Sequence, residues 1–511
     1  YSDYFSHIDN WMMQEELPML YNQYKITIPH VFIYNIELRG KDYIQVKQRD
    51  SSIHATEREG SSAGGVSKDF IVSAQETTFT SRNLPAIRQD EPYCWCPEDY
   101  KVQVSFDLQG TQFTPNEYKP YSQKWEDVDN QLLKPENTQF GKYLSFTNPF
   151  RPETKQAYNS EMSFEEKVIC AFQVLKKKMA WNGRYQLYSK ELEKVIPKGN
   201  GSNADLNFIL ISILKDFGLE AYPVVLSRRS SGMLPYNFPS LQKLNTFIVA
   251  VYDINKQKYV FLDGSMDVPT LNILPLELSV NKARILSPKV KEEKKWVNVM
   301  ALADNKSFMK IEARLEGNQV KGHRSTILYG QEAVEYQANE KHKQDSIVSN
   351  PESNASLKNK LTVTNLKVKK QENDRALIEE EFDFVLQTDR TDDHLYINPM
   401  LFPHLKSNPF IQTERVLPIE FPYPYKFTML ATLTLPEGYE VEETPQPQVI
   451  RTQGDGLQCK YMIQRQGNTI SLNYIFYLKE PIFLTEQYKQ LQELWTKVIE
   501  KNNEILVLKK I

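Results

Sequence analysis

Residues 201–223, GSNADLNFILISILKDFGLEAYP, contain a buried helix and the start of the strand that follows it. Residues 208–214 are apolar except for Ser212, a length typical of a core helix and far below the roughly 20 residues that span a bilayer. Polar Ser202 and Asn203 stand where a helix cap belongs, and Gly218 is a natural residue just past a helix end. The stretch therefore predicts a helix from about Asp205 to Phe217 inside a compact domain.

A second helix precedes this stretch and three strands follow it. The segment SFEEKVICAFQVLKKKMAW opens with a capping-box pattern, Ser163 and Glu166, and continues with apolar residues at helical spacing. The segments AYPVVLS, NTFIVAVYD and KYVFLDG are short apolar runs, the last two joined by the turn INKQ. This order predicts a compact α+β domain over residues 156–295.

The flanking regions alternate apolar and polar residues with the period of strands. Residues 1–155 contain YKITIP, VFIYNIEL and KVQVSFDL, and residues 296–511 contain KFTMLATLTLP and TISLNYIFY. We expect antiparallel β domains on both sides of the core. The polar stretch 49–65 predicts a loop. The first residues resemble the middle of a domain, so we expect the 1–155 domain to lack strands at its N-terminal side. Near the other end, Tyr488, Leu491, Trp495 and Val498 form one helical stripe.

Composition excludes several classes of protein. The net charge of -3 gives no electrostatic reason to expect nucleic acid as a partner. No apolar run is long enough for a transmembrane helix. Four cysteines in 511 residues are too few for a disulfide scaffold. We recognise no set of metal ligands, and we expect neither a metal nor a cofactor.

The core resembles the transglutaminase-like domain, a branch of the papain-like cysteine enzymes. In that family a Gly-x-Cys-x-Asp pattern opens the central helix, and GSNAD occupies its place here. The family's catalytic His begins the next strand, and its Asp ends the following strand in an LD pattern, as in LNTFIVAV and FLDGS. The resemblance therefore places Asn203 at the nucleophile position, Thr246 at the His position and Asp263 at the Asp position.

The two bond-making groups of the family are replaced. The family's reaction needs a thiolate and an imidazole that moves its proton, and neither Asn203 nor Thr246 can supply them. No histidine lies between residues 55 and 322, and the only cysteine of the core domain, Cys170, is on the preceding helix. A histidine supplied by a flanking domain remains open at this point.

The flanking segments extend the resemblance over nearly the whole chain. Residues 8–29 and 408–445 are similar to β domains that bracket such a core in a group of exported bacterial proteins of unknown function. The resemblance implies an α+β, mostly β protein, with a transglutaminase-like core between two antiparallel β-sandwich-like domains. It also implies export, to the periplasm or the cell surface.

Each candidate site residue has two interpretations. Asn203 and Asp205 form a helix cap, or they line a retained pocket as ligand contacts at a helix start. Asp263 is a turn residue before glycine, or a relic carboxylate in the old cleft. Arg228, with Arg229, belongs to a solvated loop, or it binds an anionic group at the cleft's rim.

Two functional hypotheses follow. The first is a non-catalytic binding or scaffold protein of the bacterial cell envelope, which uses a degenerate protease fold to bind a protein, peptide or glycan. The alternative is an active cysteine-type peptidase or amide acyltransferase whose site the sequence does not assign.

Overall fold

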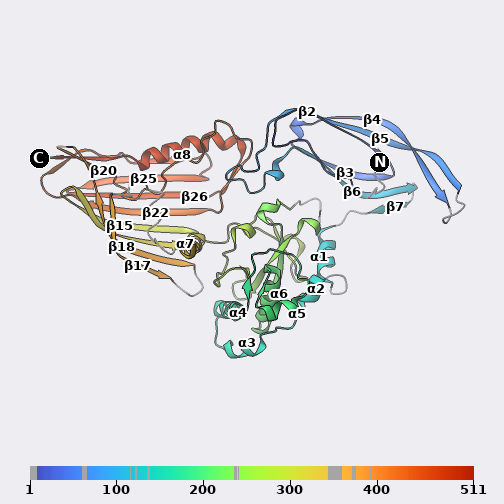
Figure 1. Ribbon diagram of the computed structural model, residues 1–511, viewed down its shortest axis with the longest axis horizontal. Coiled ribbons are helices and arrows are strands. Elements are labelled where there is room, and N and C mark those ends of the chain that lie inside the picture. Colours follow the sequence, from blue (N-terminus) through green and yellow to red (C-terminus); the bar gives the residue numbers. More distant parts are fainter. Residues whose placement is uncertain are drawn as a thin grey trace. The chain divides into compact units, whose positions relative to one another are not determined.

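A computed structural model gives the fold, and Figure 1 follows the chain from end to end. The structure describes residues 8–59, 66–114, 117–120, 124–134, 139–234, 239, 241–342, 360–370, 376–391 and 393–511. Strands outnumber helices and nearly all strand pairs are antiparallel, which confirms the expected α+β, mostly β class. Two compact units make up the chain: residues 1–142 with 227–244, and residues 143–226 with 245–511. The three-domain division stays a prediction.

The first unit contains two antiparallel sheets around one apolar core. Phe79 and Val104 are buried in this core, and Tyr24, Ile36 and Phe106 pack against it from the alternating faces that the sequence indicates. One sheet has the order β2-β5-β4 and the other the order β1-β6-β3, with β7 also paired to β6. The strands are β1 (Trp11–Met12), β2 (Met19–Pro29), β3 (Phe32–Arg39), β4 (Gln45–Glu59), β5 (Val66–Leu84), β6 (Gln103–Thr114) and β7 (Glu117–Pro120).

The polar stretch expected to be a loop is mostly strand. β4 and β5 pair along their whole length, from Gln45 opposite Thr80 to Glu59 opposite Val66. The prediction of a loop over residues 49–65 is therefore wrong for its described part. Residues 45–50 of β4 are exposed on both faces and need no apolar alternation, so the pattern that identifies other strands is absent there.

Three short helices lie where only strands were expected. They are α1 (Trp125–Leu133), α2 (Gln139–Leu144) and α3 (Arg151–Ala157). Trp125, Val128 and Leu132 of α1 are buried and stand at helical spacing. The β interpretation of residues 1–155 therefore fails beyond residue 124, where the spacing of the apolar side chains changes from two to three and four.

The second unit contains a five-stranded sheet with α4 (Phe164–Lys178) and α6 (Asn203–Asp216) packed against each other and α6 against the sheet. Both expected helices and their caps are confirmed, including Ser163 as the first cap and Gly218, with φ 74°, after α6. The sheet order is β12-β11-β10-β13-β14. Its strands are β10 (Glu220–Leu226), β11 (Thr246–Asp253), β12 (Lys258–Leu262), β13 (Ala283–Ile285) and β14 (Trp296–Val297).

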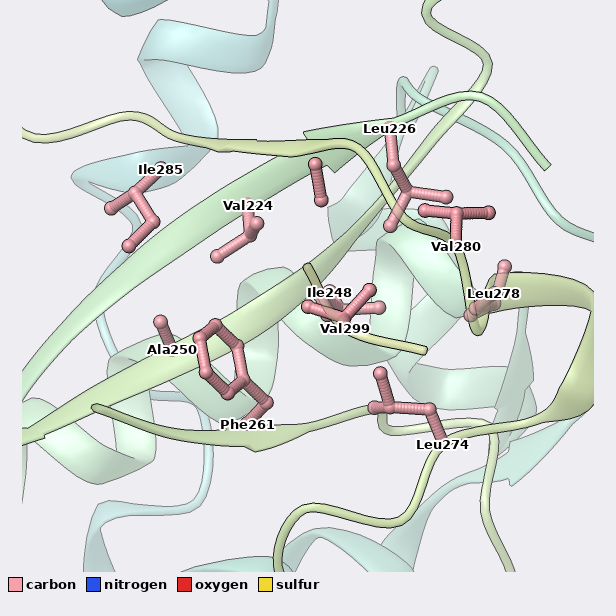
Figure 2. Close-up of a cluster of buried hydrophobic side chains, with 11 residues drawn as sticks. Val224, Leu226, Ile248, Ala250, Phe261, Leu274, Leu278, Val280, Ile285 and Val299 are labelled. Atoms are coloured by element: carbon pink, nitrogen blue, oxygen red, sulfur yellow. The ribbon is translucent and has the colours of Figure 1, made fainter. Parts of the chain in front are cut away.

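Both faces of this sheet are buried. Phe247 on β11 lies against Phe208 of α6, with ring centroids 4.8 Å apart. The next residue, Ile248, points to the opposite face and joins an apolar cluster with Val224 and Phe261 (Figure 2). Burial on both faces explains why these strands are continuous apolar runs rather than alternating ones.

An insertion leaves this sheet between β10 and β11. Residues 227–244 belong to the first compact unit, although the strands on either side belong to the second. The backbone N–H of Asn245 donates to the Leu226 carbonyl at 3.2 Å, so the insertion starts and ends at neighbouring points of the sheet. The sheet therefore accommodates the insertion without breaking its strand order.

The C-terminal part is built on an eight-stranded sheet, β17-β18-β16-β15-β22-β26-β25-β24, with a four-stranded sheet, β19-β20-β28-β23. The strands of the large sheet are β15 (Lys306–Glu316), β16 (Gln319–Tyr329), β17 (Leu361–Lys370), β18 (Leu377–Gln387), β22 (Tyr425–Thr434), β24 (Gln448–Arg451), β25 (Leu457–Gln466) and β26 (Thr469–Leu478). The small sheet has β19 (Asp389–Arg390), β20 (His394–Ile397), β23 (Tyr439–Glu443) and β28 (Leu506–Lys510), and α7 (Gln331–His342) follows β16.

Helix α8 (Tyr488–Asn502) lies along the large sheet (Figure 1). The four residues of its predicted stripe, Tyr488, Leu491, Trp495 and Val498, are all buried. The Trp495 ring lies 5.6 Å from the ring of Phe476 on β26, so the helix covers the inner face of the sheet. In the described part of the chain no helix combines the length and apolarity that a bilayer crossing requires.

A buried ion pair lies inside the large sheet. Arg324 on β16 donates to the Glu380 carboxylate on β18, and Tyr336 of α7 donates to the same carboxylate at 2.7 Å. The Arg324 guanidinium also stacks over the Phe382 and Phe402 rings, 4.4 Å and 4.9 Å from their centroids. The pair joins two strands and one helix in a setting of low polarity.

Removing one partner of this ion pair should lower the free energy of unfolding more than removing both partners. We expect Arg324→Met alone to lower the free energy of unfolding by about 3–5 kcal/mol, because it leaves the Glu380 charge buried. The double variant Arg324→Met/Glu380→Met should recover most of that loss. Urea unfolding of both, beside Lys321→Met at the surface as a control, measures the difference. Equal losses in the single and double variants would contradict this account.

Candidate functional site

The first turn of helix α6 is capped by its own side chains. Ser202 is the N-cap: the backbone N–H of Asp205 donates to its Oγ at 3.3 Å, and the backbone N–H of Ser202 donates to the Asp205 carboxylate at 2.8 Å. The helix start is therefore a complete capping box. Asn203 is the first helical residue rather than the cap. The Asp205 carboxylate is committed to this box and is buried.

The Asn203 side chain joins three segments of the chain. Its Nδ2 donates to Thr246 Oγ1 at 2.7 Å and to the Phe247 carbonyl at 3.2 Å, both on β11. Its Oδ1 accepts from the backbone N–H of Gln186 at 2.8 Å. The backbone N–H of Asn203 donates to the Arg184 carbonyl at 3.1 Å. The amide thus uses both of its donor hydrogens and its acceptor within the protein.

Asn207, one helical turn further on, extends this network. Its Nδ2 donates to the same Phe247 carbonyl at 2.8 Å and to Asp263 Oδ2 at 2.9 Å. Its Oδ1 accepts from the backbone N–H of Gly264 at 2.7 Å. A Cβ at Gly264 would lie 2.8 Å from Leu206 Cβ, so this approach of strand end to helix requires glycine.

Asp263 is held at the end of β12 by neutral donors. Its Oδ1 accepts from the backbone N–H of Ser265 at 2.9 Å and from the Ser265 hydroxyl, and its Oδ2 accepts from Asn207. Burial raises the pKa of Asp263 above its ordinary value, while the hydrogen bonds from Ser265 and Asn207 oppose that rise. Asp263 therefore shapes the turn after β12 and also lies in the buried network, and its interpretation as a relic carboxylate stays a prediction.

The structure brings the three triad positions together, but without an opening. Asn203 and Thr246 are fully buried and Asp263 is 1% exposed. Within the described residues, none of the hydrogen bonds of these side chains or of Asn207 involves a histidine or a cysteine. Cys170 Sγ lies on α4 and donates to the Ala157 carbonyl at 3.6 Å. The arrangement holds the helix, the sheet and the 184–186 segment together, and its hydrogen bonds among the described residues include neither a thiol nor an imidazole.

Three of the four cysteines of the chain are poor nucleophiles as placed. Burial raises the pKa of the Cys96 and Cys170 thiols, and it raises the pKa of Cys459 to about 11. A raised pKa lowers the thiolate fraction at neutral pH, and the thiolate is the reactive form.

The loop that contains Arg228 and Arg229 is less exposed at Arg229 than a solvated loop would be. Arg229 is 7% exposed and its guanidinium lies 4.1 Å from the centroid of the Trp95 ring. The backbone N–H of Met233 donates to Asp99 Oδ2 at 2.7 Å. The expectation of a solvated loop is wrong for Arg229, because cation–π stacking on Trp95 offsets its desolvation. Half-buried Arg228 lies in the first compact unit, whereas Asn203 and Asp263 lie in the second.

The sequence reasoning missed Asn207 and Gln186. Asn207 could have been recognised from the sequence, because it stands four residues after Asn203. Both amides therefore lie on one face of a mostly apolar helix. A buried asparagine pair at this spacing requires partners, and the neighbouring strand supplies them. Gln186 had no signal, because it contributes only its backbone N–H.

The described residues contain no group of three or more His, Cys, Asp or Glu side chains that could hold a metal ion. The expected absence of a cofactor stays a prediction.

Comparisons with known proteins agree with the architecture. Residues 393–508 match a family described as a domain of unknown function with a solved structure (DUF3858). A crystal structure from Parabacteroides distasonis, described as that of a "putative protease", superposes with a TM-score of 0.50 and 14% sequence identity. The match covers 98% of this chain and 74% of that one. No curated protein matches the chain. At this identity the similarity shows a protease-like fold and not an activity.

The asparagine network yields a stability prediction. We expect Asn207→Asp to lower the free energy of unfolding by more than about 3 kcal/mol, because it places a second carboxylate against Asp263 in a buried setting. Asn473→Asp on the exposed face of β26 makes the same chemical change and should shift stability by less than about 0.5 kcal/mol. Urea unfolding at neutral pH compares the two. Similar losses would show that the Asn207 network does not constrain the fold.

A second prediction concerns pH. Since the folded pKa of Asp263 is raised, its contribution to stability is full below its ordinary pKa of 3.8 and is lost as pH rises toward the folded value. Asp263→Asn removes that loss. We expect the melting temperature of Asp263→Asn, relative to the unsubstituted protein, to rise as the pH increases from about 4 to 7. Melting curves across this range test it, and a constant difference would contradict it.

Proposed function

We propose that this chain is a non-catalytic binding or scaffold protein of the bacterial cell envelope, built on a degenerate transglutaminase-like, protease-related fold. One observation carries the proposal: Asn203 and Thr246, which the resemblance places at the Cys and His positions of transglutaminase-like proteins, are joined at 2.7 Å and fully buried. Catalysis at this position would need a thiolate, a base and access for a substrate.

The network has a structural role that a thiol could not fill. Asn203 supplies two donors and one acceptor to β11 and to residue 186, whereas a cysteine offers one weak donor and one weak acceptor. With Asn203 at this position the site has no reactive thiol, and it gains hydrogen bonds that join helix α6 to β11 and to residue 186. Export and location in the envelope rest on the resemblance of the flanking β segments and remain proposals, as does binding of a protein, peptide or glycan ligand.

A second candidate function is amide-bond hydrolysis or acyl transfer through another site. The solved structure described as a "putative protease" favours it, since its fold is similar over nearly the whole chain. Activity at another site would have to use groups outside the Asn203 network, so substitution of Asn203 and Asp263 would not abolish it.

Thiol labelling separates the two. With iodoacetamide on the folded protein at neutral pH, we expect Cys96, Cys170 and Cys459 to react no faster than an unactivated thiol, because burial raises their pKa values. Mapping of labelled peptides, with the urea-unfolded protein as the full-labelling reference, gives the rate at each site. Rapid selective labelling of one cysteine, or turnover of an amide substrate that survives Asn203→Ala and Asp263→Ala, would reject the proposal.

A further inference from the structure

The large C-terminal sheet has one covered face and one open face. On β22, β26 and β25 every second residue is buried, including Phe427, Tyr474 and Cys459, and Trp495 of α8 packs against this inner face. The alternate residues point outward. The outer face of β22, β26, β25 and β24 is called the outer ladder below.

Apolar side chains continue across the outer ladder from strand to strand. Leu430 pairs with Asn473, which pairs with Met462, and Ile475 pairs with Lys460, which pairs with Val449. Ile475 is the diagonal neighbour of both Leu430 and Met462, and Met462 is that of Val449, a separation that long side chains span on one face of a sheet. The exposed fractions are 38% for Leu430, 47% for Met462 and 51% for Val449. These side chains form a contiguous patch, whereas scattered surface apolar residues would require no explanation.

The charge of the outer ladder is of one sign. Its charged side chains are Lys426, Lys460 and Arg451, and none of the outward side chains of these four described strands is acidic. The chain as a whole carries a net charge of -3, so this face differs from the average surface. Arg451 pairs with exposed Asp455 at 3.3 Å, whereas Lys426 and Lys460 ion-pair with no residue in the described part of the chain.

We propose that the outer ladder is a docking surface for a protein partner whose contact segment carries apolar and acidic side chains. An apolar centre with uncompensated lysines is complementary to such a segment in both shape and charge. The inference goes beyond the proposed function, because it assigns a surface and the chemistry of its partner, at a place separate from the Asn203 network.

The composition of the ladder favours protein over other occupants. Sugars stack on aromatic rings, and the ladder's centre is aliphatic, with Tyr477 at its margin opposite Lys426 and Gln458. Binding to a membrane surface usually relies on an amphipathic helix that buries its apolar face, whereas these side chains stand on a flat sheet. A flat, partly apolar sheet face suits another protein surface.

The expected affinity is modest. Four strands about 4.8 Å apart, over roughly 25 Å of their length, present on the order of 500 Å². Stable interfaces bury about 800 Å² on each partner, so this face suits a transient contact.

The test measures binding of two short fluorescent peptides to the full chain by anisotropy at low salt. One alternates glutamate with leucine, and the other has lysine in place of each glutamate. We expect the acidic peptide to bind at least about ten-fold more tightly, with an affinity that falls as salt is added. Equal binding of both peptides, or binding of neither, would overturn the proposal.

Charge variants locate the contact. Lys426→Glu/Lys460→Glu should weaken binding of the acidic peptide by at least about ten-fold. The matched control is Lys489→Glu/Lys497→Glu, which makes the same charge change on exposed positions of α8, on the other side of the sheet. The control should change binding by less than about two-fold. If both double variants weaken binding alike, the effect is one of net charge and the docking site is rejected.

An uncharged variant and vesicles complete the test. Leu430→Ser/Met462→Ser removes apolar surface without changing charge and should weaken acidic-peptide binding several-fold, with an unchanged melting curve as the folding check.

Vesicles of phosphatidylglycerol, compared with phosphatidylcholine vesicles, test whether the outer ladder binds an anionic membrane. Vesicle binding that requires Lys426 and Lys460 while the acidic peptide fails to bind would overturn the protein partner in favour of a lipid surface.

Discussion

Two asparagine amides converge on one carbonyl group, and the core of the second unit depends on that convergence. Asn203 and Asn207 both donate to the Phe247 carbonyl, at 3.2 Å and 2.8 Å. Their remaining hydrogen-bonding groups bind Thr246, residue 186, Asp263 and the backbone at residue 264. A buried polar network of this kind stabilises only when every member is satisfied, and unpaired members are costly. The network therefore fixes the register of helix α6 against β11 and against the end of β12 more tightly than apolar packing alone can.

The elements that carry a period or a cap could be predicted from the sequence. The cap at Ser163, the glycine after α6 and the buried stripe of α8 follow from local rules and are confirmed. Strand β4 could not be recognised, because its residues 45–50 are exposed on both faces and impose no apolar alternation. Among the candidate site residues, the convergence of Asn203, Thr246 and Asp263 follows from the resemblance to a known core. The hydrogen bonds of Asn203 to the distant segment 184–186 do not, because no local pattern reveals them. The stacking of Arg229 on Trp95 likewise joins residues far apart in the sequence.

The protease-like fold and the buried asparagine network occur together in this chain. A cysteine enzyme keeps its helix start open, because the thiolate must meet substrate and the free N–H groups must stabilise charge. In this chain the same helix start is filled by a capping box and two amides, and every polar group is satisfied internally. The lysines of the outer ladder differ from these groups, since Lys426 is exposed, Lys460 is half-buried, and neither forms an ion pair in the described part of the chain.

The insertion between β10 and β11 has a consequence for how the chain can be divided. Residues 227–244 interrupt the second unit and complete the first, so the backbone passes between the units three times, after residues 142, 226 and 244. Domains joined by a single linker can be separated by one cut in that linker. Here one cut after residue 142 would leave Arg229 and Met233 without Trp95 and Asp99, their contacts in the first unit. The two units are therefore interleaved in the sequence, and neither can be inherited, exchanged or lost as one continuous segment without damage to the other.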